Sequence, residues 1–481
     1  MSTPATALVR AGTPRGRWVL LATILGSSLA MLDGTVVNVA LAAIARDLGG
    51  SFTALQWIVN GYTLTLASLI LLGGVLGDRY GRRRVFLVGV VWFAVASALC
   101  AAAPDERVLV AARALQGVGG ALLTPGSLAI ISASFDPRDR ARAVGVWSGL
   151  GGVAGALGPF LGGWLVALDW RWVFLVNLPL AALVVVVTLR HVPESLDEDG
   201  VPGRRLDVLG ALLVVAALSG TTYGLTEAGR VGWAAVPVTV ALLGVAAGAL
   251  FVVVERRTRY PLVRLDIFAD RVFTATNVVT VFVYAALGVY FFLLVLQLQV
   301  VSGWSPLAAG TSILPVTACM LLLSGRAGAL AQRVGPRPLM ATGCLLAAAG
   351  FLLALRIGPD ASYPSDVLPS VLLLGLGLAA TVAPLTASVL AAAPAHLAGA
   401  ASGINNATAR SAGLLAIAVV PAVAGLGRAG SDDPGVLAHG FAVAMLVSAG
   451  LLVVGALVSW FGLGRAGGRT RAAQDPVGAP H

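Results

Sequence analysis

Long apolar stretches alternate with short polar segments along almost the whole chain of 481 residues. A helix that crosses a membrane needs about 20 mostly apolar residues. Stretches of that kind cover residues 18–42, 54–76, 85–103, 108–134, 143–167, 172–190, 207–228, 234–254, 273–300, 306–331, 338–357, 366–392, 399–426 and 437–463. The pattern therefore predicts an all-α membrane protein with fourteen transmembrane helices.

The composition agrees with a membrane protein and argues against several other classes. Hydrophobic residues make up 58% of the chain and charged residues 11%, whereas soluble domains carry about 25% charged residues. The three cysteines lie inside apolar stretches, so neither a disulfide framework nor a metal site is expected. The chain has no lysine and therefore lacks the P-loop lysine of ATP-driven pumps. Glycine runs at 117–119 and 149–152 do not follow a strand, so no nucleotide cofactor is expected.

The distribution of arginine predicts which helix ends face the cytoplasm. All 32 basic residues are arginine, and the net charge is +10. With the N-terminus inside, 23 arginines fall on segments predicted to be cytoplasmic and 6 on the opposite loops. Cytoplasmic loops of membrane proteins carry such an excess. We therefore expect a multi-pass protein of the cell (plasma) membrane with both termini in the cytoplasm, and no nucleic-acid partner.

A weak internal repeat divides the chain into two halves. When the sequence is shifted by 254 residues, segment 74–83 aligns with segment 328–337. Five of the aligned positions hold the same residue in both segments, either glycine, leucine or arginine. Asp78 is instead aligned with Gln332. Parallel repeats of six helices are typical of two-domain transporters. The predicted units are an N-terminal half at 1–190, a cytoplasmic linker at 191–206, an inserted helix pair at 207–254, a C-terminal half at 255–463 and a cytoplasmic tail at 464–481.

Two charged residues within apolar stretches are candidates for proton coupling. A carboxylate at the centre of a membrane costs about 3 kcal/mol on insertion scales, so Asp33 needs a watery cavity or a partner. Along ideal helices, Asp33 lies about 14 Å and Arg113 about 9 Å from the outer ends of their spans. We therefore expect the two to meet, so that the Asp33 proton, Arg113 and substrate compete. The alternatives are a structural acid at Asp33 and an Arg113 side chain that extends to the membrane surface.

Five motifs make the chain resemble the major facilitator superfamily, specifically its fourteen-helix drug/proton antiporter branch. Residues 74–83 (GVLGDRYGRR) are similar to that family's loop 2–3 signature, and residues 32–41 (LDGTVVNVAL) to its first-helix motif, with Ala42 in place of the usual proline. Residues 113–119 (RALQGVG) resemble the motif tied to proton coupling. Residues 158–163 (GPFLGG) resemble the antiporter motif, although Ala154 stands at its second glycine position. Residues 170–179 (WRWVFLVNLP) are also similar to this branch.

The resemblance implies roles for particular residues of this chain. Proton coupling would fall on Asp33 and Arg113. Loop 2–3 gating would fall on Gly74, Asp78, Arg79, Gly81 and Arg82, and the antiporter motif comprises Gly145, Gly158, Pro159, Gly162 and Gly163. Candidates for a substrate cavity between the halves, each of which could instead hold helices together, are Asn38, Gln56, Trp57, Asn60, Tyr62, Gln116, Tyr290, Gln297, Asn405, Asn406 and Arg410.

Asp78 ends the second predicted helix, where the helix dipole disfavours a negative charge. We therefore expect it to pair with arginine or with the positive N-terminus of a facing helix. By the internal repeat, and by what the resemblance implies, that helix begins near residues 398–399. By the resemblance, this loop would hold the two halves together on the cytoplasmic side when the cavity opens outward.

Together these features predict a proton-coupled secondary transporter with the major facilitator fold, two six-helix halves plus an inserted helix pair. It would export small amphipathic, drug-like compounds by alternating access, as a monomer in the lipid bilayer. The proton gradient would supply the energy, without a cofactor. An importer or exchanger of the same fold is an open alternative. A membrane-embedded enzyme or a sensor is a more distant one, because the four histidines are scattered and no segment reads as a soluble output domain.

Overall fold

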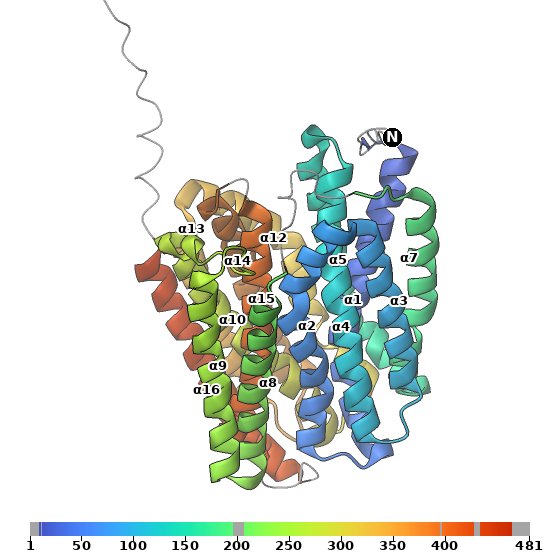
Figure 1. Cartoon of the computed structure of the whole chain (residues 1–481). Coiled ribbons are helices and arrows are strands. Elements are labelled where there is room, and N and C mark those ends of the chain that lie inside the picture. The colour runs from blue at the N-terminus through green and yellow to red at the C-terminus, as the bar shows by residue number, and fades with distance from the viewer. Residues whose placement is uncertain (1–8, 11, 196–205, 395–396, 428–432, 464–481) are drawn as a thin grey trace, which may run out of the picture.

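The computed structural model describes residues 9–10, 12–195, 206–394, 397–427 and 433–463. The helices form a bundle in which their axes are roughly aligned (Figure 1). Within the described part, fourteen helical segments are long and apolar enough to cross a membrane, which confirms the predicted number. An isolated parallel bridge between Val9 and Phe135 ties the N-terminal segment to the connection between two of these helices.

The helix bounds follow the chain in three sets. The first set is α1 (Pro14–Leu48), α2 (Phe52–Tyr80), α3 (Arg82–Ala101), α4 (Glu106–Ser134), α5 (Pro137–Leu168), α6 (Trp172–Leu175) and α7 (Asn177–His191). The second set is α8 (Val208–Val231) and α9 (Ala235–Arg257). The third set is η1 (Leu265–Ala269), α10 (Arg271–Leu296), η2 (Gln297–Val301), α11 (Pro306–Thr311), α12 (Leu314–Val334), α13 (Pro336–Leu353), η3 (Ala354–Arg356), η4 (Tyr363–Val367), α14 (Leu368–Ala392), α15 (Ala398–Val423) and α16 (Pro434–Gly462).

Local signals extend α1 beyond its apolar stretch. The side chain of Thr13 accepts a hydrogen bond from the backbone N–H of Gly16, and Pro14 follows, so α1 begins four residues before the predicted stretch. Gly49, with φ of 68°, ends the helix six residues after the predicted boundary. The helix therefore has 35 residues, and Asp33 lies near its middle instead of in the outer part of a shorter span.

Two spans that were predicted to be continuous are interrupted. The sixth breaks at Val176 between α6 and α7, and the tenth breaks at Ser312 and Ile313 between α11 and α12. Apolar residues continue through or around both breaks, so hydropathy alone did not reveal them. The first break is important for the site because it makes Asn177 the first residue of α7.

The internal repeat is visible in two helix connections. Gly81 joins α2 to α3 with φ of 105°, and Gly335 joins α12 to α13 with φ of 87°. Both values lie in the region that favours glycine, because a side chain at Cβ would be strained there. The two glycines are 254 residues apart, so the sequence shift aligns two turns of similar shape.

The helices pack mainly within two groups. In the first group, α4 lies against both α2 and α3, and α1 packs along α5 and α7. In the second group, α14 lies against α12 and α13, and α10 packs along α15 and α16. The helices α8 and α9 pack on each other, and α8 also contacts α2 of the first group and α15 of the second. Most of α9 is exposed, as expected for an apolar helix that faces lipid.

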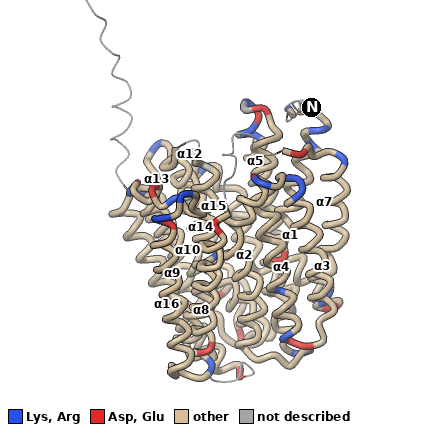
Figure 2. Tube along the Cα trace, viewed as in Figure 1, with Lys and Arg blue, Asp and Glu red and all other residues tan. Residues whose placement is uncertain are grey.

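Charged residues gather at the two ends of the bundle (Figure 2). One end holds Arg82, Arg83 and Arg84 at the start of α3, together with the N-terminal segment, and is called the arginine-rich end. The other end holds Gly49, between α1 and α2, and is called the opposite end.

The two groups are packed more closely near the opposite end. A Cβ added at Gly163 of α5 would lie 2.6 Å from Cα of Leu307 on α11. Nearby, Nε2 of Gln299 donates to the backbone oxygen of Val39 at 2.9 Å. Toward the arginine-rich end, a Cβ would meet no described atom within 4 Å at four glycines of α5 and α12, namely Gly145, Gly149, Gly325 and Gly328. Helices α5 and α11 are therefore in close contact near the opposite end, whereas these glycines of α5 and α12 face open space toward the arginine-rich end.

Candidate functional site

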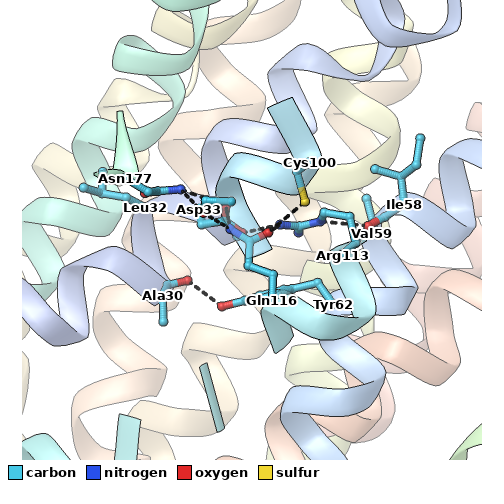
Figure 3. Close-up of polar contacts among 12 residues, drawn as sticks. Ala30, Leu32, Asp33, Ile58, Val59, Tyr62, Cys100, Arg113, Gln116 and Asn177 are labelled. Atoms are coloured by element: carbon cyan, nitrogen blue, oxygen red, sulfur yellow. Dashed lines mark hydrogen bonds and ion pairs between the residues drawn. The ribbon is translucent and has the colours of Figure 1, made fainter. Parts of the chain in front are cut away.

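Asp33 and Arg113 form an ion pair in the interior of the first helix group (Figure 3). Nη1 of Arg113 donates to Oδ2 of Asp33, and the exposed fractions of the two side chains are 1% for Arg113 and 0% for Asp33. Nε of Arg113 donates to the backbone oxygen of Ile58 on α2, 3.1 Å away. The guanidinium carbon lies 4.4 Å from the ring centroid of Tyr62. The expected contact between Asp33 and Arg113 is therefore present, and their role in proton coupling stays a prediction.

Two side-chain amides complete the surroundings of the Asp33 carboxylate. Nε2 of Gln116 donates to Oδ1 of Asp33 at 2.8 Å and to Oγ of Ser97 at 2.7 Å. Nδ2 of Asn177 donates to the same two oxygens, at 3.3 Å and 3.2 Å. These four side chains form a closed ring of hydrogen bonds, in which each amide nitrogen uses both of its hydrogens. Because Oδ2 accepts from Arg113, both carboxylate oxygens have donors.

Short local spacings bring these groups together from α1, α2, α3, α4 and α7. Arg113 and Gln116 are three residues apart on α4, and Ser97 and Cys100 are three residues apart on α3, so each pair shares a helix face. Oε1 of Gln116 accepts hydrogen bonds from Nη1 of Arg113 at 2.6 Å and from Sγ of Cys100 at 3.6 Å. Asn177 enters the site because α7 begins there, directly after the break at the end of α6.

Sequence reasoning did not identify Ser97, Cys100 or Asn177 as site residues. Asn177 had a signal, since it lies in the motif 170–179, but that motif by itself assigned no role to it. Ser97 had none, because a serine in an apolar helix commonly bonds its own backbone. Gln116 was expected in the substrate cavity, whereas the structure places it in the ring around Asp33.

The ring holds one negative and one positive group that balance each other. Removing either partner would leave an unpaired buried charge, which costs about 3–5 kcal/mol in proteins. Uptake of a proton by Asp33 would cancel its charge and weaken its attraction to Arg113. The arrangement can therefore convert binding of a proton into a change in the hydrogen bonds of Arg113. Among the described residues, no cluster of three or more His, Cys, Asp or Glu side chains is placed to hold a metal ion.

Four of the predicted cavity residues are each buried within their own helix group, two in the first and two in the second, and are hydrogen-bonded there. Gln116 belongs to the ring, and Tyr290 lies in the second group with its hydroxyl 3.1 Å from Oγ of Ser370. The hydroxyl of Tyr62 and the amide of Gln297 donate to backbone oxygens of their own groups at 3.0 Å and 2.8 Å. In this conformation, these four side chains do not share a space between the groups.

Among the other predicted cavity residues of the first group, one reaches the boundary with the second. Gln56 of α2 donates to the backbone oxygen of Ile417 on α15 at 2.7 Å. Asn60, one turn further on the same face of α2, is 0% exposed, and neither atom of its amide has a hydrogen-bond partner among the described residues. Asn38 of α1 is half-buried, and its Oδ1 has no such partner either. Trp57 turns toward α8, where its ring lies 6.1 Å from that of a tyrosine.

The second group contributes polar residues of α15 to this boundary. Nε of Arg410 donates to Oδ1 of Asn406 at 3.2 Å. Arg410 is half-buried and close enough to Tyr62 of the first group for a Coulombic interaction. Nδ2 of Asn405 instead donates to oxygens of Asn277 and a threonine on α10, at 3.1 Å and 2.8 Å. Among the described contacts, Arg410 and Asn406 are thus the predicted cavity residues of α15 that make no hydrogen bond to α10, although Arg410 also lies close enough to Tyr284 of α10 for a Coulombic interaction.

Two hollows in the described part lie away from this boundary. One of about 620 Å³ lies near the opposite end and is lined by Trp304, Ala308, Thr311, Ser312 and Tyr363. The other, of about 660 Å³, lies on the outer surface of α3, α4 and α7 and has an apolar lining. Neither is lined by a ring residue or by a predicted cavity residue, so neither is the predicted substrate cavity.

The antiporter motif packs α5 against α1 and α11. A Cβ at Gly158 would collide with the side chain of Thr35, and one at Gly162 would lie 3.0 Å from a backbone oxygen of α1. From the other side, a Cβ at Gly310 of α11 would lie 2.9 Å from the carbonyl carbon of Pro159. The first glycine of the motif lies in the loosely packed part of α5, so the close contacts are made by residues 158–163.

Glu194 binds the connection between α2 and α3 to the end of α7. Its Oε1 accepts a hydrogen bond from the backbone N–H of Arg83 at 3.1 Å, and its Oε2 lies 3.5 Å from Nε of Arg84. The carboxylate therefore sits at the N-terminus of α3, where the helix dipole favours a negative charge. Gly81 leaves the room for it, because a Cβ there would lie 2.7 Å from Oε1. Sequence reasoning did not identify Glu194.

Asp78 has the arginine partner that was expected. Its Oδ1 lies 3.0 Å from Nε and 2.9 Å from Nη2 of Arg82. The helix α15 begins at Ala398, as predicted. Among the described residues, no hydrogen bond or ion pair joins Asp78 to α15 in this conformation. The conformation that would test the proposed contact between the halves is the outward-open one.

Comparisons with known proteins agree with this architecture. The model of the family described as Major Facilitator Superfamily matches residues 23–418. The chain is 38% identical over 418 residues to "Puromycin resistance protein pur8" of Streptomyces alboniger, covering 85% of this chain and 82% of that protein. It is 39% identical over 395 residues to "Multidrug resistance protein Stp" of Mycobacterium tuberculosis (strain CDC 1551 / Oshkosh), covering 81% and 72%. It is 36% identical over 398 residues to "Multidrug efflux pump LfrA" of Mycolicibacterium smegmatis, covering 82% and 78%.

Solved structures share the fold at low sequence identity. A bacterial homolog of the human lysosomal transporter Spinster, in an inward-facing and occupied conformation, matches with a TM-score of 0.65 and 18% identity, covering 94% of this chain and 97% of that chain. A POT family transporter in complex with a thioalcohol-conjugated peptide matches with a TM-score of 0.67 and 15% identity, covering 93% and 96%. At these identities the likeness concerns the fold alone.

Proposed function

Because the chain belongs to the major facilitator superfamily, we propose that this membrane transporter exports small amphipathic compounds in exchange for protons. The observation that carries the proposal is the buried pair of Asp33 and Arg113 within its ring of amide donors. An ionisable residue inside a membrane is costly and usually marks a substrate or proton pathway. Asp33 would carry the proton, and Arg113 would be released when Asp33 becomes neutral.

The proposed orientation places the arginine-rich end in the cytoplasm, with both termini there, in the plasma membrane. It rests on the excess of arginine at that end. The loosely packed part of the bundle, between α5 and α12, then faces the cytoplasm. The seal formed by α5 and α11 faces outward. This is the conformation in which an exporter would take up its substrate and release the proton of Asp33.

The proposed substrates are drug-like compounds with both apolar and polar parts. Relatives of this chain are named for resistance to puromycin and to methylenomycin A. At the boundary between the helix groups, Asn38, Asn60 and Asn406 would offer hydrogen bonds, and Arg410 a positive charge. We propose that the protein works as a monomer in the bilayer and uses the proton gradient, without an organic cofactor or metal.

The proposal can be tested with inverted membrane vesicles that are energised so that their interior becomes acidic. Puromycin is the first compound to test, followed by methylenomycin A. Wild-type protein should let protons leave the vesicles when a transported compound is added, as measured with a fluorescent pH probe. In Asp33→Asn the release should fall to the level of vesicles without the protein, because the side chain can no longer take up a proton.

Two results would contradict parts of this proposal. Proton release of equal size in wild type and Asp33→Asn, at equal protein amounts in the membrane, would remove Asp33 as the proton carrier. Accumulation of labelled puromycin that persists after the proton gradient is dissipated would remove proton coupling altogether.

A further inference from the structure

We propose that Asn177 is a positioning residue that transmits the protonation state of Asp33 to the junction between α6 and α7. The inference rests on the proposed function, because it takes Asp33 as the proton carrier. Asn177 donates through Nδ2 to Oδ1 of Asp33, and Figure 3 shows it reaching the carboxylate from the side away from Arg113.

The described donors fill three of the four lone-pair positions of the Asp33 carboxylate. Oδ1 accepts from two amides and Oδ2 accepts from Arg113. When an O–H bond forms on the carboxylate, its charge is lost and it becomes a weaker acceptor, so the hydrogen bonds from these donors weaken and the weakest is the first to break. The donor distances of Asn177 are 3.3 Å and 3.2 Å, against 2.8 Å and 2.7 Å for Gln116. Because longer hydrogen bonds are weaker, Asn177 is the donor that withdraws at the smallest cost.

Loss of the hydrogen bond from Asn177 to Asp33 would affect the backbone, because Asn177 lies at the junction between α6 and α7. Side-chain hydrogen bonds attach the segment 170–177 to α1 at Asp47 and at Asp33, and Nη1 of Arg171 is one of the donors to Asp47, at 2.9 Å. Nε1 of Trp170 donates to Oδ2 of Asp47 at 2.8 Å, and Asn177 donates to Asp33. Between them, the ring of Phe174 lies 5.8 Å from the guanidinium carbon of Arg113. The helix is interrupted at Val176, and chain breaks of this kind are where small changes in backbone angles are absorbed. Loss of one attachment would therefore let α7 move relative to α1.

The surroundings of Asp33 limit how large the effect of Asn177 can be. The charged and titratable groups that face Asp33 are Arg113 on α4, Tyr62 on α2 and Cys100 on α3. From α7 the facing group is the neutral amide of Asn177. A change at Asn177 therefore alters hydrogen bonding without altering the charge of the site. We expect a shifted proton equilibrium, in contrast to the complete loss expected for Asp33→Asn.

The test measures proton binding directly and needs no transported compound. Infrared difference spectra of the purified full-length protein are recorded between about pH 4 and about pH 9, and the carboxyl band of Asp33 is the one missing in Asp33→Asn. In Asn177→Leu, the pH at which half of Asp33 is protonated should rise by about one unit, because the ionised form loses a donor. In Asn177→Ser, the shorter side chain keeps a hydroxyl donor, so this pH should rise by less.

Thr188→Val is the matched control on the same helix. Thr188 is buried, its hydroxyl has no hydrogen-bond partner among the described residues, and valine has nearly the same shape. Its titration midpoint should equal that of wild type, which separates loss of the Asn177 donor from a general disturbance of α7.

The outcomes distinguish this inference from the proposed function. If no band is missing in Asp33→Asn, Asp33 does not titrate and the proposed function loses its proton carrier. If the Asp33 band titrates but its midpoint is the same in wild type, Asn177→Leu and Asn177→Ser, the inference about Asn177 is wrong and the proposed function stands. Should Asn177→Leu fail to fold, the smaller Asn177→Ser change gives the same decision.

Discussion

The two helix groups satisfy their interior polar side chains in different ways. In the first group, an ion pair between Asp33 and Arg113 is enclosed by amide donors. In the second group, Asn405 bonds to Asn277 and Tyr290 to Ser370, all neutral side chains, while the charged Arg410 bonds to the neutral Asn406 and has no described carboxylate partner. The first interior thus holds a buried carboxylate paired with an arginine, while the contacts named for Asn405 and Tyr290 in the second join neutral groups.

The same asymmetry appears at the repeated turns. Gly81 and Gly335 adopt similar backbone angles, so the shape of the turn is repeated. In the first turn, the arginines are paired with Asp78 and Glu194. In the second, Arg337 lies over the ring of Trp460, with its guanidinium carbon 4.4 Å from the ring centroid. The duplication therefore conserved the fold more closely than the charges, and we expect the two groups to have different tasks.

The largest effect within this comparison is expected from the packing of α5. Gly158→Leu should abolish transport, because even a Cβ at this position collides with Thr35 of α1. The matched change in the second group, Gly325→Leu, should leave transport near the wild-type level, because a Cβ at Gly325 meets open space. Uptake of puromycin into inverted vesicles measures both, at equal protein amounts. Equal transport by the two variants would show that the close contact is not needed.

An effect of about tenfold to a hundredfold is expected at Arg410, on the second-group side of the boundary. Arg410→Ala removes a charged hydrogen-bond donor, a loss of about 1.5–3 kcal/mol when the partner is a bound substrate. The concentration for half-maximal transport should rise by about tenfold at the lower end of this range and by about a hundredfold at the upper end, since about 1.4 kcal/mol corresponds to a factor of ten. The dependence of proton release on pH should stay as in wild type. If Arg410→Ala shifted the pH dependence of proton release, the second group would also take part in proton coupling, and the proposed difference between the two groups would be wrong.

The smallest effect is expected at the first repeated turn. Asp78→Asn removes the ion pair with Arg82, which is partly exposed and is therefore worth about 1 kcal/mol or less. We expect transport to slow a fewfold while substrate binding, measured by equilibrium dialysis with labelled puromycin, is unchanged. Gln332→Asn, at the equivalent place of the second turn, should leave the rate as it is. If the transport rate of Asp78→Asn is unchanged, the turn takes no part in transport and its arginines serve only to set the orientation of the protein in the membrane.

Much of the fold could be predicted because hydropathy and arginine placement act over whole segments. Fourteen spans, the repeat and the start of α15 near residues 398–399 all follow from such long-range patterns. The predicted pairing of Asp33 with Arg113 followed from a simpler argument: charged side chains inside a membrane need partners, and these two lay at similar depth.

The other site residues depend on tertiary contacts that carry little sequence signal. Ser97 and Asn177 are ordinary polar residues until α3 and α7 place them beside Asp33. Tyr290 and Gln297 were predicted to line the cavity because they are polar residues in apolar stretches. The structure gives both internal partners instead, and hydropathy cannot distinguish the face of a helix that meets a cavity from the face that meets a neighbour.

The location of the contact between α5 and α11 has a mechanical consequence. Gly163 touches Leu307 only five residues, or about 8 Å, from the end of α5 at Leu168, whereas 26 residues, or about 39 Å, separate it from the start at Pro137. If the two helix groups rock about this contact, α5 is a lever with unequal arms. The arginine-rich end then sweeps about five times as far as the opposite end. A movement of about 2 Å at the short end of α5, near Leu168, would accompany an excursion of about 10 Å at the far end, so a small movement beside the contact gives a wide opening toward the arginine-rich end.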